Sequence, residues 1–284
     1  MTTYLVVGGG YTGTRVARRL PNAACVGRKN PGIPPENFQQ RDLDQAGLGE
    51  IAVKRPYRLL YTVPPATDAA SDRRLGSFLA ALAHAPERIV YLSSSGVYGD
   101  QQGQLVDESV TPDPQSARAK RRWDAEQQIT NYAVNTGCTA VFLRVPGIYG
   151  PGRLGLERIG DSMPVIREQD AHPGNRIHVR DLVQCCLAAL QLDDIEGIIN
   201  VGDGDHRSST WFTNTVARIA GLPAPPEVTR AEAEETLSRR RLSFLGESRR
   251  LDVSRMHDVL GVQLKFANPE DGIRASLGAG KPQA

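Results

Sequence analysis

The chain has 284 residues, of which 40% are hydrophobic and 23% charged, and its formal net charge at pH 7 is +2. This composition is that of an ordinary globular protein with enough length for a substantial core. The charge is far below the basic excess of a dedicated nucleic-acid-binding protein, and no apolar run approaches the roughly 18 residues of a membrane span. The four cysteines form no C-x-x-C pair, so we expect no metal site and a reduced, cytoplasmic protein.

The first half of the chain alternates short apolar segments with helical patterns. Strands are predicted at residues 4–7, 23–28, 57–65, 87–99 and 139–145. Helices are predicted between residues 10 and 21, over residues 71–84, and after Pro112 and Pro114. Strands that alternate with helices in this way predict a parallel, doubly wound α/β sheet.

The alternation loosens after about residue 146. One strand is predicted at residues 197–201, and helices are predicted at residues 181–190, 210–220, 231–241, 255–260 and after Pro269. We expect residues 151–284 to supply late sheet elements and a smaller, interleaved, helix-rich substrate lobe.

Gly8, Gly10 and Gly13 form the pattern G-x-G-x-x-G between the first strand and the first helix. In dinucleotide sites the first glycine permits a tight turn, the second lets the backbone approach a pyrophosphate, and the third lets helix pack on strand. The alternative is a glycine-rich turn that binds no ligand. We expect residues 1–150 to be an NAD(P)-binding Rossmann domain, with Tyr11 and Thr12 also contacting the cofactor.

The end of the second strand indicates which dinucleotide is bound. NAD sites usually carry a carboxylate there for the ribose 2′-hydroxyl, but this strand is followed by Arg28 and Lys29. An arginine would instead pair with a 2′-phosphate, so we expect NADP, with NAD as second choice. The alternative is that both cations lie on a surface loop. Further cofactor contacts are expected at the ends of later strands, from Asp42, Leu43, Val63 and Pro64.

Three further stretches, YLSSSGVYG (91–99), LRVPGIYGPGR (143–153) and RIHVRDL (176–182), complete a family pattern. With the glycine motif, and in this order, they resemble the extended short-chain dehydrogenase/reductases of the NAD-dependent epimerase/dehydratase group. The resemblance covers nearly the whole chain. Val7 stands where the family's more usual G-x-x-G-x-x-G would need a glycine.

The resemblance implies a Ser or Thr after the fifth strand that holds the substrate oxygen. Counting back three residues from Val97 places this role on Ser94, with Ser95 on the substrate side. It also implies a Tyr as general acid or base. A Lys four residues later would bind the nicotinamide ribose and lower the pKa of that Tyr.

The stretch RAKRRWDAE (118–126) lies where this Tyr and Lys are expected. Aligned on Glu126, the family helix places Arg122 at the Lys position and Arg118 at the Tyr position. An alternative register uses Lys120 as the Lys and places Ser116 at the Tyr position. Neither supplies a tyrosine. We prefer the first register, which resembles atypical family members with a pair of arginines.

Arg118 cannot act as a base, because arginine stays protonated at any working pH. It can bind a carboxylate, a phosphate or a developing oxyanion. An alternative is a surface ion-pair ladder, since Arg118, Arg122 and Glu126 share one helix face. Nucleic-acid binding is disfavoured, because Trp123 is the only stacking aromatic residue in the cluster.

Several substrate-side residues follow from the same resemblance. Arg153 lies where family members open into the substrate lobe. His178 either lines the cleft or is a buried, hydrogen-bonded histidine, and Asp181 is expected to cap the following helix. Arg249 and Arg250 either face the cleft or belong to a solvated charge run, residues 238–252.

We therefore expect an NADP-dependent oxidoreductase or epimerase that acts on a small, anionic substrate. Ser94 and Arg118 would act on the substrate, and the proton donor is unassigned, because Tyr98 and Tyr149 are expected to pack in turns. The alternative is a non-catalytic NADP-binding sensor. No nucleic-acid or membrane partner is expected, and a homodimer is compatible with the family resemblance.

Overall fold

The structure is a computed structural model that describes residues 2–67, 71–236 and 246–279. Within these residues seven strands form one parallel sheet, in the order β11 (Gly197–Asn200), β7 (Thr139–Val145), β5 (Arg88–Ser94), β4 (Tyr57–Tyr61), β1 (Thr3–Val7), β2 (Ala23–Gly27) and β3 (Phe38–Gln40). The strand order reverses between β1 and β4. This confirms the doubly wound parallel sheet, and such a reversal opens a crevice at the carboxyl ends of the strands.

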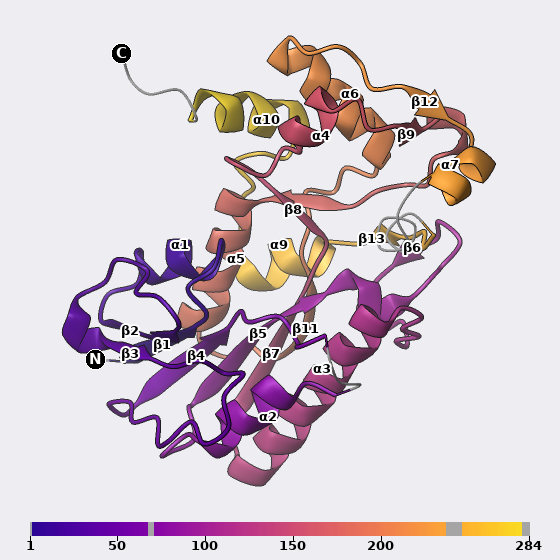
Figure 1. The fold of residues 1–284 in the computed structure, drawn as a ribbon. Coiled ribbons are helices and arrows are strands. Elements are labelled where there is room, and N and C mark those ends of the chain that lie inside the picture. Colours follow the sequence, from indigo (N-terminus) through magenta and orange to yellow (C-terminus); the bar gives the residue numbers. More distant parts are fainter. Residues whose placement is uncertain (1, 68–70, 237–245, 280–284) are drawn as a thin grey trace.

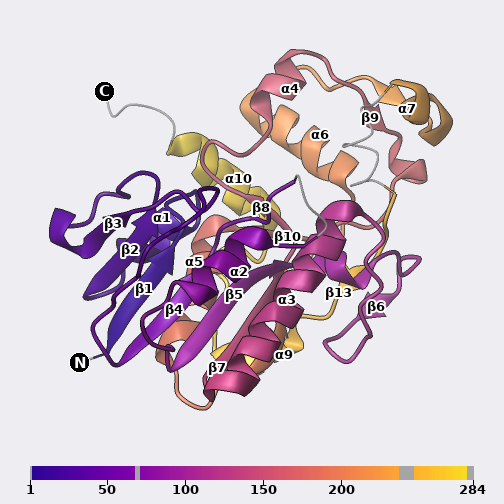
Figure 2. The ribbon, with the colours of Figure 1, turned by 60° about the horizontal axis from the view of Figure 1, so that its bottom comes forward.

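Helices cover both faces of the sheet (Figures 1 and 2). One face carries α2 (Arg73–Ala80) and α3 (Ala117–Thr136), and the other carries α1 (Gly13–Ala17), α5 (Val179–Gln191) and α9 (Ser254–Leu260). Side chains of β5 alternate between the two resulting cores: Ile89 and Tyr91 join one, Val90 and Leu92 the other. Because β5 is buried on both faces, its residues are apolar without alternation, and this explains the continuous apolar run in the sequence.

A smaller lobe lies at the top of Figure 1. Its elements are α4 (Leu156–Gly160), β9 (Val165–Ile166), α6 (Ser209–Ala220), β12 (Glu227–Val228), α7 (Arg230–Thr236) and α10 (Pro269–Gly278). Among the described residues, separate two-stranded parallel sheets are formed by β8 (Gly147–Tyr149) with β10 (Arg176–His178), by β9 with β12, and by β6 (Leu105–Val106) with β13 (Arg250–Leu251). Single 3₁₀ turns are η1 (Pro35–Asn37), η2 (Ser95–Tyr98) and η3 (Glu168–Asp170). No described helix is long and apolar enough to cross a membrane.

The second helix is shorter than predicted. It begins after Asp72, whose side chain accepts a hydrogen bond from the Leu75 amide. It ends by Ala81 because the chain there pairs with Ile51: the Ile51 amide donates to Ala81 O, and the Ala83 amide donates to Ile51 O. The predicted helix over residues 231–241 is seen as α7, and its last five residues lie outside the described residues.

A buried ion pair joins α3 to the sheet. Arg144 of β7 and Glu126 of α3 have side-chain exposures of 0% and 2%, and Arg144 Nη2 lies 2.8 Å from Glu126 Oε2. Arg144 Nε also donates to Glu126 Oε1, and the Ser93 hydroxyl donates to the same oxygen. The alternative of an ion-pair ladder along the surface of α3 is therefore wrong, because Glu126 points into the protein and pairs with Arg144 of β7.

This pair should be costly to break. In Arg144→Met, Glu126 would keep a buried charge without its partner, and we expect a loss of about 3–5 kcal/mol of unfolding free energy. Urea unfolding followed by circular dichroism measures it. Arg274→Met is the control, because Arg274 pairs with Glu270 in solvent and should leave stability unchanged. Equal effects of the two variants would contradict the prediction.

Candidate functional site

Three adjoining cavities lie along the carboxyl ends of the strands. The glycine-loop cavity, about 650 Å³, is lined by residues 8–10, 26–29, 41–44, 62–64 and 74. The central cavity, about 710 Å³, is lined by residues 10–13, 62, 64, 65, 67, 92–94, 96, 118, 119, 121, 122, 145, 146, 148 and 153. The lobe cavity, about 300 Å³, is lined by residues 94–96, 118, 146–147, 166, 171–175, 209, 230, 247 and 249. Shared lining residues, such as Gly10 and Ser94, make them neighbours in one crevice.

The three glycines of the loop occupy their positions for different physical reasons. Gly8 has φ +102°, and a Cβ on Gly13 would lie 2.0 Å from Gly8 O. These two positions therefore require glycine for backbone conformation and packing. A Cβ on Gly10 would meet no described atom within 4 Å, and Gly10 lines two cavities. The open space at Gly10 is where a ligand could approach the backbone.

The far end of the glycine-loop cavity is cationic. Arg28 and Lys29 follow β2, and Arg41 follows β3. Arg41 Nε is buried and makes no hydrogen bond within the described part of the chain. At the rim, Arg74 binds Asp44 through two hydrogen bonds, and these lower the pKa of Asp44.

The other predicted residues of this cavity come from the ends of β3 and β4. The cavity lining includes Asp42, Leu43, Val63 and Pro64. Thr62, which the sequence did not single out, lies at the junction with the central cavity, and its hydroxyl donates to Val7 O.

Tyr11 joins the glycine loop to the lobe. Its ring lies between two guanidinium groups, with Arg15 Cζ and Arg153 Cζ each 4.0 Å from the ring centroid. Its hydroxyl donates to Pro151 O at 3.0 Å. Tyr11, Arg153 and the buried Thr12 all line the central cavity, where the sequence predicted them.

Ser94 and the arginines of α3 meet across the central cavity. Ser94 ends β5, and its Oγ accepts from the Gly96 amide at 3.1 Å. Arg118, Arg121 and Arg122 all line the cavity. Arg122 is fixed by hydrogen bonds of 2.9 Å to the Tyr91 hydroxyl and to Leu92 O.

The two registers proposed for α3 place different residues at the site. The arginines of the first register, Arg118 and Arg122, face the central cavity. In the second register, Lys120 is exposed, and Ser116 lies outside the linings of the three cavities. Ser95 is buried and lines the lobe cavity.

The two tyrosines considered as replacement acids are packed in the interior. Tyr98 donates to Asn200 Oδ1 at 2.8 Å, and burial raises the pKa of its hydroxyl. The Tyr149 ring packs against His178 and Phe212, and burial raises its pKa as well. Neither residue lines the three cavities.

His178, with 1% exposure, is the cap of α5. Its Nδ1 accepts from the Arg180 amide at 3.1 Å, and its Nε2 lies 3.2 Å from Ser276 Oγ. The expected cap, Asp181, was wrong. Because α5 begins at Val179, Asp181 already lies within the helix, and its carboxylate accepts from the backbone amides of residues 265 and 266.

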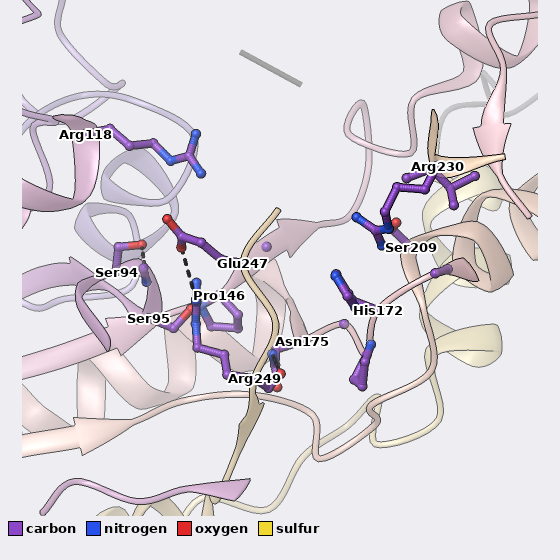
Figure 3. A pocket seen from close by; sticks show the side chains of 16 residues that line it. Ser94, Ser95, Arg118, Pro146, His172, Asn175, Ser209, Arg230, Glu247 and Arg249 are labelled. Carbon is purple, nitrogen blue, oxygen red and sulfur yellow. Dashed lines mark hydrogen bonds and ion pairs between the residues drawn. The ribbon is translucent and has the colours of Figure 1, made fainter. Parts of the chain in front are cut away.

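The basic stretch of residues 238–252 reaches the lobe cavity through Arg249, whereas Arg250 is exposed and donates to Gly103 O. Arg249 donates to Gly99 O and pairs with Glu247 (Figure 3). Residues 238–245 lie outside the described residues. Further cavity residues that sequence reasoning missed are His172, Asn175, Arg230 and Glu247. They come from distant segments, and no local pattern marks them.

Residues 68–202 match the family model described as the NAD dependent epimerase/dehydratase family. The matched region includes Ser94 and α3. Protein YeeZ of Escherichia coli (strain K12) is 27% identical over 190 residues, which cover 66% of this chain and 62% of that protein. The match thus spans less than two thirds of that relative's length.

Solved structures are similar over almost the whole chain. A functionally unknown conserved protein from Silicibacter pomeroyi has a TM-score of 0.81 and 26% identity, with 99% of this chain and 100% of that chain covered. The human epimerase family protein SDR39U1 (isoform 2), solved with NADPH, has a TM-score of 0.73 and 17% identity, with 96% and 98% covered. These structures confirm the fold. Among the described residues no cluster of three His, Cys, Asp or Glu side chains could hold a metal.

The cap at His178 should make stability depend on pH. Burial lowers the pKa of His178 to about 4, so between pH 6.5 and 4 the unfolded chain binds the proton and the folded protein does not. The free energy of unfolding should therefore fall by up to about 3 kcal/mol as the pH is lowered through this window. Urea unfolding of wild type and His178→Asn, which keeps a neutral acceptor, isolates the effect.

Burial raises the pKa of Asp203 to about 7, so this group makes the folded protein more stable as the pH is lowered. The effect is the same in the wild type and in His178→Asn, and it therefore cancels when the two pH profiles are subtracted. An identical pH dependence of wild type and variant would contradict the prediction.

Proposed function

We propose that the protein is an NAD(P)-dependent oxidoreductase or epimerase of the epimerase/dehydratase type. It prefers NADP and acts on a small, anionic substrate. One observation carries this proposal: a continuous crevice runs from the cationic ends of β2 and β3, past the open face of Gly10, to Ser94 and the arginines of α3. Its position at the strand reversal is where doubly wound sheets bind dinucleotides.

The residues present fit a dinucleotide phosphate. Gly10 leaves room for a diphosphate beside the backbone. Arg28, Lys29 and Arg41 line this cavity, and their side chains offer donors for a 2′-phosphate at the ends of β2 and β3. The NADPH bound to human SDR39U1 supports the same class of cofactor for this chain. When bound, the nicotinamide would supply or accept a hydride.

The chain's own residues would hold the substrate. Ser94 would donate to the reacting oxygen from the end of β5. Arg118, which lines both the central and the lobe cavity, would stabilise negative charge on the substrate. Arg122 would act as a fixed cation, because two hydrogen bonds already hold its guanidinium. The four buried, unpaired cysteines support a reduced, cytoplasmic setting.

A second candidate is a non-catalytic NADP-binding sensor. It is favoured by the face of α3, where Arg118 and Arg122 stand at the Tyr and Lys positions of the preferred register. An enzyme should oxidise NADPH in the presence of a substrate, and this oxidation should require Ser94. A sensor should show no such oxidation, and NADPH should change its affinity for a partner.

Arg28 should determine the choice of nucleotide. In Arg28→Ala, loss of a charge-assisted hydrogen bond to a 2′-phosphate should weaken NADPH binding roughly 10- to 100-fold and leave NADH binding unchanged. Calorimetric titration measures both affinities. The control is Arg73→Ala, because Arg73 is exposed on α2 and lies outside the cavities. Tighter binding of NADH by the wild type would overturn the NADP preference.

Alanine substitutions at Gly10 and Gly13 should distinguish a loss of NADPH binding from a loss of stability. In Gly10→Ala the new methyl group enters the open crevice, so we expect an unchanged melting temperature and at least roughly tenfold weaker NADPH binding. In Gly13→Ala the methyl group meets Gly8 O, so the melting temperature itself should fall. Undiminished NADPH binding by Gly10→Ala would show that the nucleotide does not pass this loop.

A further inference from the structure

The lobe cavity contains a carboxylate close to the serine and arginine of the proposed site. Glu247 has 10% side-chain exposure, and its Oε2 lies 3.1 Å from Nη1 of Arg249, which has 12% exposure. Figure 3 shows the Glu247 carboxylate directed towards the space between the Arg118 guanidinium and the Ser94 hydroxyl. Glu247 is the only carboxylate among the described residues that line the central and lobe cavities.

The backbone around Glu247 is firmly held beside the loop that follows β5. The Ser248 amide donates to Asp100 Oδ1 at 2.8 Å, and Ser248 O accepts from the Gln101 amide at 2.8 Å. Arg249 Nη1 donates to Gly99 O at 2.6 Å. These bonds hold the backbone next to Glu247 and the guanidinium that pairs with its carboxylate, and a proton-transfer group benefits from being oriented in this way before a ligand binds.

The loop that follows β5 also brings the Glu247–Arg249 pair next to Ser94. A Cβ on Gly96 would lie 3.3 Å from Ser94 Oγ and 3.9 Å from Arg249 Nη2. The hydroxyl and the guanidinium therefore border one small space, and the absence of a side chain at Gly96 keeps it open. A substrate oxygen held by Ser94 would lie near the group that Arg249 orients, Glu247.

We propose that Glu247 is the general base of this site and takes the role for which α3 supplies no tyrosine. This inference rests on the proposed function. The proton of the substrate hydroxyl passes to a Glu247 oxygen, while the carbinol hydrogen leaves with its electron pair to the oxidised nicotinamide, so a carbonyl forms. Arg118 cannot accept this proton, but it stabilises the oxygen as the proton leaves. In the reverse direction protonated Glu247 returns the proton.

The test compares the affinities of the two redox forms of the cofactor. The nicotinamide ring is positively charged only when oxidised, so a carboxylate facing the reacting atoms favours NADP⁺ over NADPH. Calorimetric titration of the full chain with each nucleotide should give a ratio Kd(NADP⁺)/Kd(NADPH) that rises roughly fivefold in Glu247→Gln. The NADPH affinity should be unchanged, which also shows that the variant is folded.

Two variants serve as controls. Glu247→Asp keeps the charge and should keep most of the wild-type ratio. Glu196→Gln removes an exposed carboxylate outside the cavities and should leave the ratio unchanged. With a substrate found by screening anionic alcohols, Glu247→Gln should also lower the oxidation rate by roughly 10²- to 10⁴-fold.

The outcomes separate the two proposals. Nucleotide binding with an unchanged ratio in Glu247→Gln would overturn the role of Glu247 and leave the proposed function standing. Failure of the wild type to bind either nucleotide would overturn the proposed function, and the role of Glu247 with it.

Discussion

The pair between Glu126 and Arg144 fixes how α3 lies on the sheet. Because both side chains are buried and Ser93 also donates to Glu126, α3 cannot rotate without leaving charges unpaired in the interior. Arg122 and Arg118 lie one and two turns before Glu126, on the same side of the helix. The buried pair thus turns these two arginines towards the crevice. The direction in which they point follows from a contact that neither of them makes.

The charges along the crevice are uneven. Cations dominate at the glycine-loop end, through Arg28, Lys29 and Arg41, and again beside Ser94, through the arginines of α3. Glu247 interrupts this pattern in the lobe cavity. Glu247 pairs with Arg249 there, and it offers this part of the crevice a group that can accept a proton.

Local patterns in the sequence predicted the parts of the site that a single segment builds. The glycine loop, the cations after β2 and the serine after β5 all follow a strand end, and the apolar runs of the strands are visible in the sequence. Contacts between distant segments could not be predicted. The spacing of Arg122 and Glu126 suggested an ion pair along the helix, but Glu126 pairs with Arg144 of β7 instead. The lobe cavity is assembled from residues 94 to 249, so Glu247 carried no local signal.

Tyr11 links the glycine loop mechanically to the lobe. Its ring and hydroxyl connect the glycine loop to Arg153 and Pro151 at the start of the lobe. One hydrogen bond and one partly exposed cation–π contact contribute on the order of 1–2 kcal/mol. A change in the position of Arg153 or Pro151 would therefore be transmitted through Tyr11 to Gly10, its neighbour in the chain.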